Sequence, residues 1–143
     1  MNQKQVALWR RLAAALYDSI ILLALYFVAG LAAVLVNDGE AVENPVFFWV
    51  LLVIAWAFFV KFWCSPGQTL GMQVWKVKVV NERGGALTPK QASARMIFAI
   101  LSWSVLGLGF LWALLDKDGL TWHDKLSHSR LVFIDHKKQK TMK

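Results

Sequence analysis

Cysteine is nearly absent from this sequence of 143 residues, in which Cys64 is the one example. A single cysteine cannot form a disulfide within one chain, and the sequence has no CxxC pair or Cys/His cluster that suggests a structural metal site. It also lacks the sequence context of a hydrolase nucleophile elbow. We therefore expect no metal, no cofactor and no catalytic residues, and we do not expect an enzyme.

Charge is scarce wherever the sequence is apolar. Hydrophobic residues make up 57% of the chain, with eight tryptophans and nine phenylalanines, and the mean hydropathy is +0.46. The length allows one domain, residues 1–143. The formal charge of +7 comes from basic residues between and after the apolar stretches, which favours anionic lipid head groups as partners. The basic tail, residues 136–143, has no interleaved aromatic residues, so we expect no nucleic-acid partner.

Two apolar stretches, residues 12–36 and 46–64, are each long enough to cross a hydrocarbon core of about 30 Å. The first is too long for the apolar region of a cleaved signal peptide, so we expect a retained transmembrane helix. Trp49 and Trp63 lie near the ends of the second stretch, where tryptophans anchor helices at membrane interfaces. The connector, residues 37–45, is acidic and contains neither Lys nor Arg.

The distribution of positive charge predicts which segments face the cytoplasm. Lys and Arg occur before the first stretch, after the second and in the tail, and the positive-inside rule places such segments in the cytoplasm. We expect a multi-pass membrane protein with its N-terminus and C-terminus in the cytoplasm and the acidic connector outside.

The third apolar stretch, residues 96–115, has two interpretations. It follows a predicted helix start in which Thr88 is the N-cap and Pro89 the first helical residue. Gly107 and Gly109 interrupt the stretch, which favours a segment that enters and leaves the membrane on the cytoplasmic side. The alternative is a third full span, which would put the tail outside.

Two short segments have the alternating pattern of β-strands, residues 74–80 and 129–134. A lone strand has unpaired edges, so we expect these two strands to pair on one side of the membrane. The predicted fold is an α-helical integral membrane protein with two transmembrane helices, a third apolar segment and a small cytoplasmic two-stranded β element.

Asp18 is a carboxylate inside the first transmembrane stretch. A charged residue at membrane depth is costly, about 2.5–3.5 kcal/mol on insertion scales, and is by default a candidate functional residue. Arg11 precedes it by about two helical turns and therefore lies on the same helix face. Ala14 and Ala15 lie between them and are small enough to let another helix approach, which offers a contact for a homo-oligomer or another membrane protein.

Further polar candidates flank the third apolar stretch. Arg95 lies at its entrance, where it either extends to the interface or pairs with Asp18 or Asp124. We predict that Arg11, Asp18, Arg95 and Asp124 form one network on the cytoplasmic side and are the candidates for binding or ion coupling. His123 and His128 are secondary candidates, but their spacing matches no closed zinc site.

The chain resembles the RDD family of small prokaryotic membrane proteins, which is named for one arginine and two aspartates. The resemblance rests on Arg11 and Asp18 in the first helix and on Asp124 near the end. It also includes the segment Gly67-Gln-Thr-Leu-Gly71-Met and the arginine at position 95. The resemblance implies a place in the bacterial plasma (inner) membrane and a part in transport, with a link to cation/proton antiport.

Two functions from different classes remain open. The first is transport of a cation or small ligand coupled to protons, with Asp18 as the exchanging carboxylate and Arg11 lowering its pKa. Because the chain is too small to enclose a path, this function requires a homo-oligomer. The second is a non-transporting scaffold, assembly or regulatory module, in which the Arg/Asp network is structural.

Overall fold

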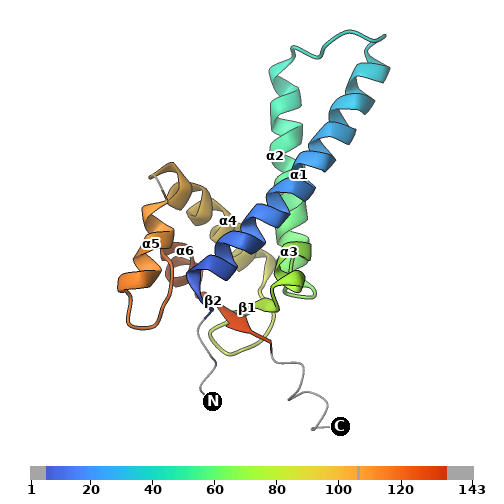
Figure 1. Ribbon diagram of the computed structural model, residues 1–143. Coiled ribbons are helices and arrows are strands. Elements are labelled where there is room, and N and C mark those ends of the chain that lie inside the picture. The colour runs from blue at the N-terminus through green and yellow to red at the C-terminus, as the bar shows by residue number, and fades with distance from the viewer. Residues whose placement is uncertain (1–5, 106, 135–143) are drawn as a thin grey trace, which may run out of the picture.

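Two long apolar helices form a hairpin that projects away from the rest of the protein (Figure 1). The computed structural model describes residues 6–105 and 107–134. Helix α1 is Leu8–Val36 and helix α2 is Pro45–Cys64, and both are long and apolar enough to cross a membrane. Helix α1 begins before the predicted residue 12, because the helical backbone continues into its polar N-terminal turn. The two predicted spans are thus confirmed as span-length helices.

Side chains along this hairpin are exposed although they are apolar. Leu23 is 68% exposed, Phe27 73% and Leu35 72%, and each would be in contact with water if the protein were soluble. An apolar surface this continuous marks a membrane or a partner interface. The exposure therefore agrees with helices that lie in a bilayer.

The third apolar stretch is broken into two helices. Helix α4, Pro89–Ser104, begins at Thr88 with the predicted N-cap, which here is a full capping box with Gln91. Helix α5 is Leu108–Leu115. Gly107 makes the break with a left-handed backbone (φ 73°), which glycine adopts without a steric penalty. At 16 and 8 residues, both helices are shorter than the roughly 20 residues of a membrane span.

The two predicted strands pair in a small antiparallel sheet. Strand β1 is Val77–Asn81 and strand β2 is Ser129–Phe133, and Val77 pairs with Phe133 while Asn81 pairs with Ser129. The prediction that the first strand starts at residue 74 is wrong. Residues Leu70–Val74 form helix α3 instead, and the hydroxyl of Thr69 accepts from the backbone N–H of Met72 to cap its N-terminus.

The segments that contain the two strands are built alike. Each has a glycine with positive φ (Gly67, Gly119), a capping threonine (Thr69, Thr121), a helix of five residues, a residue with positive φ (Lys76, His128) and a strand of five residues, all at the same intervals. In the second segment the helix is α6, Trp122–Leu126. The pairing is also symmetric, because the first residue of each strand faces the last of the other. We call these segments the two helix–strand units.

The hydrophobic core lies where the hairpin meets the sheet. Val77 and Val79 of β1 are fully buried, and Leu131 of β2, Met72 of α3 and Trp63 of α2 pack in the same cluster. The expectation that Trp63 anchors the helix at the membrane interface is wrong, because its ring is only 6% exposed. Trp49 is 64% exposed, so an interface position for this residue stays a prediction.

Candidate functional site

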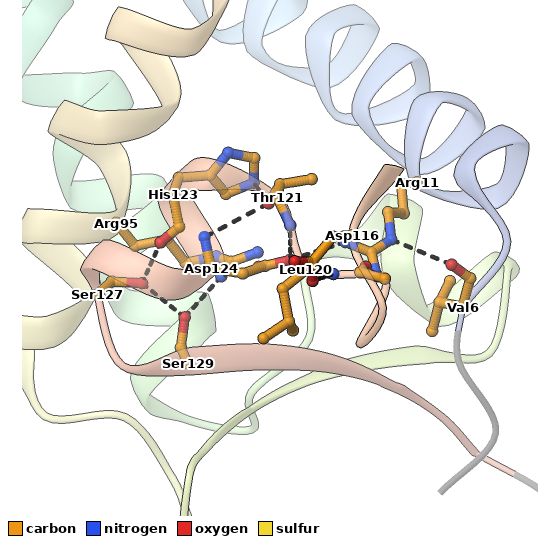
Figure 2. A network of polar contacts seen from close by, with 11 residues as sticks. Val6, Arg11, Arg95, Asp116, Leu120, Thr121, His123, Asp124, Ser127 and Ser129 are labelled. Atoms are coloured by element: carbon orange, nitrogen blue, oxygen red, sulfur yellow. Dashed lines mark hydrogen bonds and ion pairs between the residues drawn. The ribbon is translucent and has the colours of Figure 1, made fainter. Parts of the chain in front are cut away.

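One carboxylate and two arginines form a buried ion triad close to the sheet (Figure 2). Arg11 on α1 donates from its terminal guanidinium nitrogen to Asp124 Oδ2 at 2.7 Å. Arg95 on α4 donates to Asp124 Oδ1 at 2.5 Å. All three residues are at most 5% exposed. The triad therefore joins α1, α4 and α6 through one aspartate.

Asp124 is held ionised by its neighbours. It lies in the first turn of α6, where Thr121 caps the helix and the backbone N–H of Thr121 donates to Asp124 Oδ2 at 3.1 Å. Burial by itself raises the pKa of Asp124, but the charges of Arg95 and Arg11 outweigh it and hold the pKa well below its ordinary value. Neighbouring cations favour the charged form of a carboxylate.

The two arginines have further partners that extend the triad into the surrounding chain. Arg11 Nε donates to the carbonyl of Val6 at 3.1 Å, and its other terminal nitrogen donates to the carbonyl of Gly119 at 2.8 Å. Arg95 donates to the hydroxyl of Ser129 on β2 at 2.6 Å. The triad thus connects α1, α4 and α6 to strand β2.

Asp18 lies outside this triad. Its carboxylate accepts hydrogen bonds from the hydroxyl of Thr69 and from the backbone N–H of Gly71, the latter at 2.9 Å. It forms no ion pair with any residue in 6–105 or 107–134. The single network predicted from the sequence is therefore divided into a triad and a separate carboxylate, which fixes α3 against α1.

Gly71 shows how closely α3 approaches α1. A Cβ at this position would lie 2.4 Å from the carbonyl oxygen of Ala14 and 2.9 Å from Asp18 Oδ1, so only glycine fits. Ala14 is 2% exposed. The small residue that we expected to admit another subunit is thus covered by a helix of the same chain.

The two histidines differ in their surroundings. His123 on α6 is 3% exposed, and its Nε2 lies 3.0 Å from the hydroxyl of Thr121. Burial and the charge of Arg95 lower the pKa of His123 to about 3, so the ring is neutral at pH 7. His128 is exposed and lies 2.8 Å from the carboxylate of Glu82, away from the triad. No group of three His, Cys, Asp or Glu side chains suited to a metal occurs among the described residues.

Thr121, Thr69 and Gly71 were not singled out as site residues from the sequence. Thr121 lies three residues before the predicted Asp124, which is the spacing of a capping box and a recognisable helix start. Thr69 and Gly71 give a weaker signal, because their partner Asp18 is distant in the sequence.

A cavity of about 260 Å³ lies between α1, α2 and α4. Its polar end contains Arg11, Asp18, Arg95 and His123, and its remaining wall is mostly apolar. The cavity is slightly smaller than the roughly 300–1,000 Å³ of most ligand pockets. The cavity is therefore bordered both by Asp18 and by the two arginines that bind Asp124.

These features define a helical membrane protein whose membrane hairpin is joined to a small sheet by buried arginine and aspartate side chains. The model of the RDD family matches residues 6–128, and the chain belongs to this family. The matched segment contains Arg11, Asp18, Arg95 and Asp124. Neither the curated proteins nor the solved structures gave a match.

Proposed function

We propose that this RDD-family protein is a non-transporting membrane module, a scaffold, assembly or regulatory subunit, in which the triad fixes the second helix–strand unit to helix α1 of the membrane hairpin. The observation that carries the proposal is that both carboxylate oxygens of Asp124 already accept hydrogen bonds from the same chain. Both of its oxygens accept from arginines, and Oδ2 also accepts from the backbone of Thr121. A carboxylate held this way is suited to fixing structure, because releasing it would leave two buried charges without their partner.

The proposal places the sheet and both chain ends in the cytoplasm of a bacterial cell, next to anionic lipid head groups. Exposed basic residues surround the sheet end of the hairpin, namely Lys61, Lys76, Arg83 and Lys90, and such residues favour the cytoplasmic side. The α4–α5 segment would then enter and leave on that side. Its break at Gly107 supports this arrangement. The tail, residues 136–143, lies outside the described residues.

A second candidate function is proton-coupled transport of a cation or small ligand through Asp18. Asp18 favours it because this carboxylate lines the cavity and has no ion-pair partner among the described residues. Intramembrane carboxylates of this kind serve as proton or cation sites in transporters. This function requires a homo-oligomer, and the covered face at Ala14 offers no contact for one.

One experiment separates the two functions. The purified protein is reconstituted in liposomes, and cation-driven proton flux is measured for the wild type and for Asp18→Asn. We expect no flux above empty liposomes for either protein. Flux that Asp18→Asn abolishes would refute the module and establish transport at Asp18.

A further inference from the structure

Two buried hydrogen-bond donors at the cavity have no acceptor. Trp63 Nε1 on α2 and Arg95 Nε on α4 are shielded from solvent and form no hydrogen bond with any residue in 6–105 or 107–134. Both side chains line the cavity and are at most 6% exposed. Leaving a buried donor without an acceptor is costly, so these two donors point to an acceptor from outside the described residues.

The two donors lie at the same end of the cavity. The guanidinium carbon of Arg95 is 5.3 Å from the centre of the Trp63 ring. Neither an indole N–H nor a guanidinium can accept a hydrogen bond, so the group that they bind must carry acceptor oxygens. Arg11 and Arg95 share the carboxylate of Asp124, and the carboxylate of Asp18 at this end of the cavity accepts from Thr69 and Gly71, so neither carboxylate serves the two donors. A negatively charged oxygen makes the strongest bond to such donors.

The rest of the cavity wall is suited to an apolar chain. Leu22 on α1, Phe59 on α2, and Met96 and Ile100 on α4 line it. Ile100 is 51% exposed, so the wall is open on the side of α4. An opening between helices that carry exposed apolar side chains gives access from the bilayer.

We propose that this cavity binds a single-chain amphiphile with a carboxylate or phosphate head group. The head accepts hydrogen bonds from Trp63 Nε1 and Arg95 Nε, and the chain lies along Leu22, Phe59 and Ile100. The volume of about 260 Å³ accommodates a head group and part of one chain, and it is too small for a lipid with two chains.

The test is titration calorimetry of the purified protein in an uncharged detergent, with decanoate and decyl phosphate as probes. The informative variant is Trp63→Phe, which removes the N–H donor and retains an aromatic ring. Because a hydrogen bond to a charged group contributes about 1.5–3 kcal/mol, we expect decanoate to bind at least about tenfold more weakly. Trp49→Phe is the matched control on the same helix, since Trp49 is exposed, and it should bind as the wild type does.

A second variant tests the cavity without changing a donor. Met96→Trp places a larger side chain in the wall and should abolish binding of both probes. Equal affinity of Trp63→Phe and wild type for decanoate would overturn the proposal, as would equal binding of decyltrimethylammonium, which has no acceptor. Inorganic phosphate should not bind measurably. If it binds as tightly as decyl phosphate, the ligand is a water-soluble anion and the amphiphile is refuted.

Discussion

Replacing Asp124 with asparagine tests the triad most directly. The substitution keeps the shape and one carbonyl oxygen, but it removes the negative charge that Arg11 and Arg95 share. Both guanidinium groups then remain buried without a counter-ion. Removing one partner from a buried ion pair costs about 3–5 kcal/mol. At about 2–4 °C per kcal/mol for a chain of this size, we expect Tm to fall by about 10 °C.

The matched control is Asp116→Asn. Asp116 pairs with Lys125, whose side chain is 44% exposed, so solvent screens this pair and its charge contributes little to stability. Asparagine keeps an oxygen that can accept from the backbone N–H of Leu120, as Asp116 does. Thermal unfolding of wild type and both variants in the same detergent, followed by circular dichroism, gives the comparison. If the Tm of Asp124→Asn lies within a degree or two of that of Asp116→Asn, the triad does not stabilise the attachment of α4 and α6 to helix α1.

The remaining predictions concern pH, packing and topology. His123 is neutral when folded because its pKa is lowered from 6.5 to about 3, whereas the unfolded chain binds a proton below its ordinary pKa. The stability that the neutral ring contributes is therefore fully present above pH 6.5. It is lost as the pH falls toward 3, by up to about 1.4 kcal/mol per pH unit. In His123→Gln the free energy of unfolding, measured against pH, should depend less steeply on pH over this range. Gly71→Ala should destabilise the fold by about 1–3 kcal/mol, because the added Cβ meets the carbonyl of Ala14. A Cβ at position 30 has nothing within 4 Å, so Gly30→Ala should unfold at or above the wild-type temperature. A reporter fused after Lys143 should give a cytoplasmic signal, and an external signal would refute the re-entrant α4–α5 segment.

The transmembrane helices could be predicted from the sequence because composition alone determines them. A long stretch without charge has few alternatives to a membrane helix. The start of α4 was equally clear, since Thr88, Pro89 and Gln91 act within one turn. Pairing of the strands followed from the need of each strand for a partner.

Partner choice among the charged residues could not be predicted, because it depends on where the short helices lie. The sequence placed Asp18 in a network with arginines, yet its partners are the uncharged donors Thr69 and Gly71. These donors are brought to Asp18 by helix α3, whose five residues are too few to show a helical repeat in the sequence. Trp63 is similar, because only the position of Arg95 and the sheet makes it a core residue.

The two helix–strand units meet as equivalent partners in the sheet. Each unit, Gly67–Asn81 and Gly119–Phe133, has the same turns, cap and strand at the same intervals, and a local two-fold axis relates their strands. Each unit is also fixed to helix α1 by its own polar contact, since Asp18 accepts from Thr69 and Gly71 of the first unit and Arg11 donates to Asp124 of the second. Helix α1 is therefore the common support that sets the register of both strands.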